Sequence, residues 1–234
     1  MLKGKKVLVT RAKEQSGPLI QLLEKYGATV NCFPTIEIVK SADTTSLEAA
    51  LNQPFTGLIF TSGNGARIFF EHYKNLPSNI KIFVVGPNTR KIVEHCGYKV
   101  QFVPQSFKAS DLARELPFDH KDHFLIPQSN ISRNDLFDGL QERGVSFECH
   151  NLYTTRSKIH KTTDLNMNSF DWVTFTSGST VEGFLKNKIS INKSCKIASI
   201  GPSTSQMLFE KGLSPFVEAQ PHTIEGLVQA MDKY

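Results

Sequence analysis

Phe60-Thr61-Ser62-Gly63 occurs a second time in this chain, as Phe175-Thr176-Ser177-Gly178, 115 residues further along. Without any gap, the same offset takes Gly86-Pro87 to Gly201-Pro202. It also joins Lys81 to Lys196, Thr89 to Thr204, Gly97 to Gly212 and Leu112 to Leu227. Chance matches do not keep one register over such a distance, and an internal repeat decides the expected topology. We therefore expect two similar structural units.

The first part of each unit matches at an offset of 117 residues. The matching pairs are Leu8 and Leu125, Leu19 and Leu136, Leu23 and Leu140, Gly27 and Gly144, and Cys32 and Cys149. Each unit is predicted to contain a strand, a helix, a strand, a polar connector and a second strand-helix series. The two units cover residues 1 to 116 and 120 to 231.

Short apolar runs are typical of strands buried in a parallel sheet. They occur at Val7 to Val9, Leu58 to Phe60, Ile82 to Val85, Phe124 to Ile126, Val173 to Phe175 and Ile197 to Ile200. Helical periods lie between them, and one of these ends at Gly27, since a glycine can adopt the left-handed conformation that terminates a helix. Alternating strands and helices predict an α/β fold class, with parallel sheets connected by right-handed crossovers.

Two connectors interrupt this alternation at equivalent places, Pro34 to Lys40 and Asn151 to Lys158. Both are natural hinge positions. The chain could enter a second lobe through one connector and return through the other. The sequence permits this discontinuous arrangement but does not require it.

The composition favours an anionic partner for a cytoplasmic protein. The 234 residues carry a formal net charge of +5, and positive potential concentrates negative ligands. Basic residues are scattered rather than clustered in a stripe, which argues against nucleic acid. We found no signal peptide and no apolar stretch long enough to span a bilayer, so no membrane partner is expected. The four cysteines form no C-x-x-C pair and are expected to be reduced core residues.

Four predicted strand ends run directly into a small polar turn and a helix. They are Thr61-Ser62-Gly63-Asn64, Thr176-Ser177-Gly178-Ser179, and the Gly-Pro turns at Gly86 and Gly201. Such turns expose helix N-terminal amides, which attract anions, at the sheet edge where ligands bind in open α/β folds. Ser and Thr are also ordinary helix caps, so each turn has a purely structural alternative. Arg11 and Lys196 are candidate carboxylate partners, or else solvated surface charges.

Other kinds of site find little support. Gly63-Asn64-Gly65 begins a dinucleotide fingerprint, but Ile68 stands at its third glycine position and no acidic residue ends the next strand. There is no G-x-x-x-x-G-K loop, no H-E-x-x-H pattern and no G-x-S-x-G elbow. We therefore expect no cofactor and no metal, and a basic cleft lined by hydroxyls and amides.

The motifs FTSGNG, VVGPNT, TFTSGSTVEGF, IASIGPST and HTIEGL, together with Leu152-Tyr153-Thr154-Thr155, resemble those of uroporphyrinogen-III synthases. The resemblance extends from Val7 to Met231. It implies two HemD-like lobes joined by a two-stranded linker. Lobe 1 would contain residues 1–34 and 158–234, lobe 2 residues 40–150, and the linker strands residues 35–39 and 151–157.

The resemblance further implies a monomeric hydro-lyase of haem biosynthesis that needs no cofactor. Such an enzyme cyclises hydroxymethylbilane to uroporphyrinogen III, with inversion of the last pyrrole ring and loss of water. Each pyrrole of this substrate carries an acetate and a propionate. A polycarboxylate tetrapyrrole therefore agrees with the anionic partner that the charge predicts.

Tyr153 matches a tyrosine that this family directs to the cleft, and the resemblance makes it the catalytic proton donor or an orienting group. The alternative is an aromatic side chain that only packs in the linker. Substrate-binding residues are expected at Ser62, Gly63, Asn64, Gly86, Asn88, Thr89, Ser177, Gly178, Ser179, Gly201, Ser203 and Thr204. The chain departs from its relatives at Gly63 and Gly178, where a proline often follows the serine, so these turns are expected to be more mobile.

Two rival functions share these features. A two-lobed anion-binding or sensor protein would have the same lobes, hinge and basic cleft but no turnover. A sugar-phosphate or nucleotide enzyme on a doubly wound sheet would need a catalytic carboxylate or metal set that the sequence does not offer.

Overall fold

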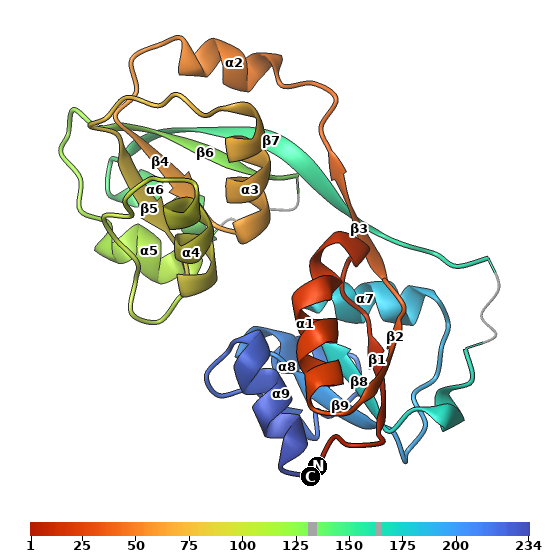
Figure 1. The fold of residues 1–234 in the computed structure, drawn as a ribbon. Helices are drawn as coiled ribbons and strands as arrows, with labels where there is room; N and C mark the ends of the chain where they lie inside the picture. Colours follow the sequence, from red (N-terminus) through yellow and green to blue (C-terminus); the bar gives the residue numbers. More distant parts are fainter. Residues whose placement is uncertain (131–134, 162–164) are drawn as a thin grey trace. The chain divides into compact units, whose positions relative to one another are not determined.

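The computed structural model describes residues 1–130, 135–161 and 165–234. The chain divides into two compact units. Unit 1 contains Met1–Ile38 and Thr155–Tyr234, and unit 2 contains Val39–Thr154. Each unit is built on its own five-stranded sheet (Figure 1).

Unit 1 combines both ends of the chain in one sheet, with the strand order β10-β9-β8-β1-β2. Its strands are β1 (Lys6–Val9), β2 (Thr29–Cys32), β8 (Trp172–Phe175), β9 (Lys196–Ser199) and β10 (Val217–Glu218). Its helices are α1 (Lys13–Lys25), α7 (Gly178–Lys186), α8 (Pro202–Glu210) and α9 (Ile224–Asp232), with a 3₁₀ turn η1 at Met167–Ser169. All the strand pairs in this sheet are parallel.

The sheet of unit 1 is buried on both faces, which explains its continuous apolar strands. Leu8 packs with Val181 and Phe184 of α7 on one face. Its neighbours in β1, Val7 and Val9, pack on the other face, in the cluster formed with α1 and α9. Successive residues of a strand point to opposite faces, so one short strand supplies both cores.

Unit 2 has the strand order β3-β7-β6-β4-β5. Its strands are β3 (Ile36–Lys40), β4 (Gly57–Phe60), β5 (Lys81–Val84), β6 (His123–Ser129) and β7 (Ser146–Ser157). Its helices are α2 (Thr45–Leu51), α3 (Gly63–His72), α4 (Pro87–His95), α5 (Ala109–Glu115) and α6 (Asp135–Glu142). One core cluster joins Ile59, Phe83 and Phe124 to α5 and α6. Phe60 contacts Phe69 and Phe70 of α3.

Equivalent strands occupy equivalent places in the two sheets. The offset of 115 residues takes β4 to β8 and β5 to β9, and the offset of 117 takes β1 to β6 and β2 to the beginning of β7. The order β9-β8-β1-β2 in unit 1 therefore corresponds to β5-β4-β6-β7 in unit 2. The α/β class and the parallel sheets that the sequence predicts are confirmed.

Helix ends also follow the sequence. Gly27, Gly97, Gly144 and Gly212 all have positive φ, between 70° and 89°. They lie just past the ends of α1, α4, α6 and α8. A side chain there would be strained, and this explains why the repeat keeps glycine at these positions.

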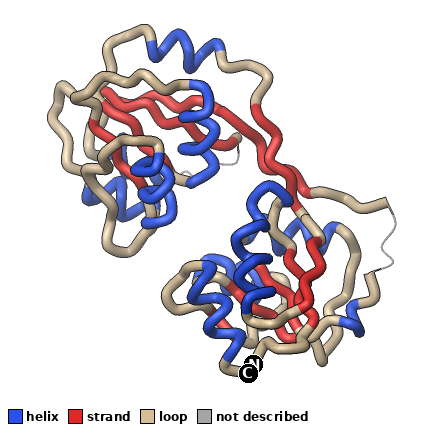
Figure 2. Tube along the Cα trace, in the orientation of Figure 1, coloured by secondary structure: helices blue, strands red, loops and turns tan. Residues whose placement is uncertain are grey.

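The expected linker 35–39 overlaps β3, which is of similar length, whereas the expected linker 151–157 belongs to a longer strand. The boundaries between the units fall at Ile38/Val39 and Thr154/Thr155, within β3 and β7. Residues 151–157 are the second half of the continuous strand β7, which begins at Ser146. Strands β3 and β7 lie side by side (Figure 2).

The cysteines differ from the expectation of four core residues. All four are free thiols, but only Cys195 is buried. Cys32 is half-buried, and Cys96 and Cys149 are exposed. Among the described residues, no helix has the length and apolar character needed to cross a membrane.

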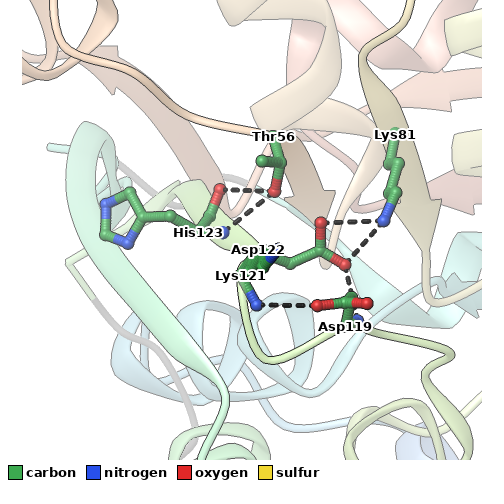
Figure 3. A network of polar contacts seen from close by, with 6 residues as sticks. All are labelled: Thr56, Lys81, Asp119, Lys121, Asp122 and His123. Atoms are coloured by element: carbon green, nitrogen blue, oxygen red, sulfur yellow. Dashed lines mark hydrogen bonds and ion pairs between the residues drawn. The ribbon is translucent and has the colours of Figure 1, made fainter.

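A polar network joins the amino ends of the strands in unit 2 (Figure 3). Lys81, the first residue of β5, contacts both carboxylate oxygens of Asp122 at 2.7 and 2.6 Å. The N–H of Asp119 donates to the same carboxylate at 2.8 Å. Thr56 accepts from the N–H of His123 at 2.9 Å. These bonds satisfy polar groups that the start of a buried sheet would otherwise leave unpaired.

Candidate functional site

Four of the described helices begin after a two-residue turn at the carboxyl end of a parallel strand. In unit 2, α3 follows β4 and α4 follows β5; in unit 1, α7 follows β8 and α8 follows β9. The first N–H groups of each helix have no carbonyl of their own helix to bind, and the helix dipole favours negative charge there. Each unit therefore has two such turns, with helix N-termini suited to anions, at one edge of its sheet.

Serines cap the first helix of each pair. Ser62 accepts from the N–H of Gly65 at 3.1 Å, and Ser177 accepts from the N–H of Thr180 at 3.3 Å. Thr180 accepts in return from the N–H of Ser177, which completes a capping box. The structural alternative considered for these serines therefore holds in both units, and any ligand contact would be additional to the cap.

Glycine and proline begin the second helix of each pair. Gly86 and Gly201 are the N-caps of α4 and α8, and the first helical residue is Pro87 or Pro202. Proline suits this position because its missing N–H would have no partner in the helix. The next residues, Asn88 and Ser203, are exposed, whereas Thr89 and Thr204 are buried.

The predicted site residues at the starts of α3 and α7 are half-buried, each at the carboxyl edge of its own sheet. Gly63 and Gly178 are the first residues of α3 and α7 and are followed by Asn64 and Ser179. The hydroxyl of Ser179 lies 2.9 Å from that of Ser177. The structure thus brings together Ser62, Gly63, Asn64, Gly86, Asn88 and Thr89 at the carboxyl edge of unit 2, and Ser177, Gly178, Ser179, Gly201, Ser203 and Thr204 at that of unit 1.

Tyr153 lies beside the cap of α3. Its phenol oxygen is 2.7 Å from Oγ of Ser62. Tyr153 also pairs with Ser129 across β6 and β7, and the Ser129 hydroxyl forms a hydrogen bond with the phenol. Only 5% of Tyr153 is exposed. Burial raises the pKa of the phenol, while the hydrogen bonds with Ser62 and Ser129 oppose that rise.

The two predicted basic contacts lie at different edges of unit 1. Arg11 follows the carboxyl end of β1 and donates from Nε to Gln15 at 3.2 Å. Lys196 is the first residue of β9, so the whole strand separates it from the turn at Gly201. Its ammonium group lies over the rings of Trp172, Phe216 and Tyr234, at 5.3, 4.4 and 5.6 Å from their centroids. Lys196 therefore lies away from the turns, and its role as a carboxylate partner stays a prediction.

Ser129 is the site residue that the sequence analysis missed. It ends β6, as Phe60 ends β4, and is a small polar residue at a strand end. A small polar residue at a strand end could have indicated Ser129 as a site residue. However, Gln128-Ser129-Asn130 has no equivalent among the repeated turn motifs. Among residues 1–130, 135–161 and 165–234, no group of three or more His, Cys, Asp or Glu side chains is arranged to hold a metal ion.

Comparison with known families gives a match over most of the chain. The profile of the uroporphyrinogen-III synthase HemD family matches residues 17–229. The chain is 29% identical to a uroporphyrinogen-III synthase of Chlorobaculum parvum, over 95% of each chain. It is also 29% identical to the porphyrin biosynthesis protein HemD of Ruminiclostridium josui, over 97% of this chain, but it spans only 48% of that longer protein.

Solved structures show the same fold. A mutant uroporphyrinogen III synthase of the extremely thermophilic bacterium Thermus thermophilus aligns with a TM-score of 0.70 over 98% of each chain, at 18% identity. The uroporphyrinogen-III synthetase of Helicobacter pylori 26695 aligns with a TM-score of 0.64, at 21% identity, over 96% of this chain and 97% of that one. At these identities the likeness concerns the fold.

Proposed function

Because the chain belongs to the uroporphyrinogen-III synthase HemD family, we propose that it cyclises hydroxymethylbilane to uroporphyrinogen III. The last pyrrole ring is inverted during closure, and water is lost. The observation that carries this proposal is the family match, which extends over residues 17–229 and so includes all four helix N-termini and Tyr153.

The helix N-termini support a polycarboxylate substrate. Acetate and propionate groups are anions of the kind that the first amides of α3, α4, α7 and α8 attract. We assign carboxylate binding to these turns, with Arg11 as a further cation at the carboxyl edge of unit 1. The formal net charge of +5 raises the local concentration of such a substrate.

Tyr153 is the proposed proton donor. An electron-rich first pyrrole expels the hydroxyl of its hydroxymethyl group and becomes an azafulvene, so the enzyme needs only to protonate the leaving oxygen. The phenol of Tyr153 carries a suitable proton and is held by Ser62 in unit 2. Its raised pKa keeps it protonated at neutral pH.

Product choice depends on conformation. The bilane closes unaided to the uninverted isomer, so the enzyme must favour attack at the substituted carbon of the last ring, through a spiro intermediate. Several contacts to the carboxylates of the bilane supply that preference, because they hold the bilane in a curled conformation. Removal of one turn contact is therefore expected to change the isomer ratio as well as the rate.

The test is a turnover assay without added metal or cofactor. Freshly prepared hydroxymethylbilane is incubated with the purified protein, and the oxidised porphyrin isomers are separated by chromatography. An excess of the type III isomer over a protein-free control supports the proposal. Type I alone, from folded protein, contradicts it and favours an anion-binding protein without turnover.

We also propose that the protein acts as a monomer in the cytoplasm. The monomer is what the family resemblance implies. Light scattering during size-exclusion chromatography tests it, and a mass about twice the chain mass of 26.2 kDa would contradict it.

A further inference from the structure

A β-bulge places Tyr153 beside Ser129. Along β6 and β7 the pairing is regular as far as Gln128 and Asn151, but the next pair is Ser129 with Tyr153. Leu152 is therefore an extra residue in β7. Neighbouring residues of a regular strand point to opposite faces, and one extra residue shifts that alternation, so the bulge decides the face toward which the buried Tyr153 points. Bulges redirect side chains in this way, often next to active sites.

The hydrogen bonds of Ser62 leave its proton free to be donated to the phenol. Oγ of Ser62 accepts from the N–H of Gly65 at 3.1 Å and lies 2.7 Å from the phenol oxygen. A serine hydroxyl has one proton and two lone pairs. The cap uses a lone pair, so the proton of Ser62 is available to Tyr153. Ser129 supplies a second hydroxyl to the same phenol.

Unit 1 has the same architecture without this cluster. Ser177, the equivalent of Ser62, caps α7, but its hydroxyl lies 2.9 Å from Ser179. The offset of 117 residues places Ala12 and Ile36 where unit 2 has Ser129 and Tyr153. Both side chains are apolar and buried. Since unit 1 forms its sheet and its serine cap without these hydroxyls, the fold itself does not require them.

We propose that Ser62 and Ser129 are positioning residues that donate hydrogen bonds to the phenol oxygen of Tyr153 and direct its O–H at the substrate. This inference rests on the proposed function and changes the role of Ser62 from carboxylate binding to support of the proton donor. Ser129 gains a role that neither the repeat nor the turn motifs indicate.

The proton step is balanced within the site. The O–H bond of Tyr153 breaks as the C–O bond of the hydroxymethyl group breaks, and the proton and the hydroxide leave together as water. The phenolate that remains is stabilised by the two serine hydroxyls. It regains a proton when ring closure releases one from the last pyrrole, so Tyr153 ends the cycle in its starting form.

Titration of Tyr153 provides a test that needs no substrate. The two hydrogen bonds counteract the effect of burial on the phenol, so Ser129→Ala and Ser62→Ala are each expected to raise the pKa of Tyr153 further. The chain has five tyrosines. The signal of Tyr153 is therefore assigned in NMR spectra of ring-labelled protein by its absence from Tyr153→Phe.

Turnover gives the second readout. Both alanine variants are expected to lower kcat by about tenfold or more, with a smaller change in KM, because the support acts in the transition state. Ser129→Thr, which keeps a hydroxyl, is expected to restore both the titration and kcat. Ser177→Ala is the matched control. It removes the equivalent cap, lowers Tm as Ser62→Ala does, and leaves the titration of Tyr153 unchanged.

The outcomes separate the two proposals. If Tyr153 titrates as in the wild type in folded Ser129→Ala and Ser62→Ala, the positioning role is wrong, whatever the activity. If the wild type makes no excess of type III isomer, the proposed function is wrong. The titration of Tyr153 needs no substrate, so its result still decides whether the two serines donate hydrogen bonds to the phenol. Should Ser62→Ala fail to fold, Ser129→Ala, which alters no cap, decides alone.

Discussion

Lys81 and Lys196 are equivalent residues of the two sheets, but their ammonium groups have different partners. Lys81 forms an ion pair with Asp122, whereas Lys196 lies over three aromatic rings. In unit 1 the ion pair uses other positions: Lys5 stands at the equivalent of Asp122, and Asp171 at the equivalent of Thr56. Lys5 and Asp171 form an ion pair at 3.0 Å. Both networks lie at amino ends of strands and are expected to act in stability.

Lys196→Met is expected to destabilise unit 1 without affecting substrate binding. The variant removes the cation from over Trp172, Phe216 and Tyr234 but keeps a long apolar side chain. Loss of cation–π attraction should cost about 1 kcal/mol and lower Tm by about 2–4 °C. Thermal unfolding and steady-state kinetics check this. A large rise in KM would restore Lys196 as a substrate contact.

Lys81→Met is expected to destabilise unit 2 by about 1–3 kcal/mol, because the buried carboxylate of Asp122 loses its cation. Urea unfolding at pH 7 measures the loss. Lys121→Met is a suitable control, since only the backbone N–H of Lys121 takes part in the network, by donating to Asp119. Equal losses in the two variants would contradict the role given to the Lys81 ion pair.

Stability is expected to fall in acid. Burial acts to raise the pKa of Asp122 and Asp171, but hydrogen bonds from backbone N–H groups and lysines outweigh it, and both pKa values are lowered. Folding is therefore favoured by these groups above their unfolded pKa, about 3.9. This contribution disappears as the pH falls through the lower, folded values. In Asp122→Asn, the free energy of unfolding should therefore depend less on pH in acid than it does in the wild type. An unchanged pH dependence would contradict the contribution assigned to Asp122.

Tyr153→Phe is expected to lower kcat by about a hundredfold, because general acid assistance typically contributes that much or more. Folding should change little, since the ring stays buried and the hydroxyl of Ser62 keeps its bond from Gly65. Type III formation under saturating substrate measures the effect. A variant with wild-type kcat would show that the tyrosine only packs.

Gly178→Pro is expected to stabilise the protein by about 0.5–1 kcal/mol, because Gly178 is the first residue of α7 and proline suits that position. An added Cβ at Gly178 would meet only the flexible side chain of Met207, at 3.4 Å. At Gly63 it would lie 2.6 Å from Cδ1 of Ile92, so Gly63→Pro should gain less. Calorimetry of the two variants compares them, and a lower Tm for Gly178→Pro would contradict this account.

Much of the site could be predicted from the sequence because its signals are local. A turn such as Thr61-Ser62-Gly63-Asn64 after an apolar run identifies both a strand end and a helix start, and the repeat shows the same pattern in the other unit. The position of Lys196 was also within reach. Five residue steps separate it from Gly201, roughly 16 Å of extended chain at about 3.3 Å per residue, so it could not have been adjacent to that turn.

The sequence by itself determined the α/β class, the parallel strands, the glycine-terminated helices and the four anion-attracting turns, because each depends on residues close together in the chain and on the repeat. Only the tertiary structure decided that Ser62, Ser129 and Tyr153 share hydrogen bonds. They lie on three different elements, and a one-residue bulge in β7 sets the face toward which Tyr153 points. Strand register arises from pairing with a distant segment, so no local pattern in β7 reveals it.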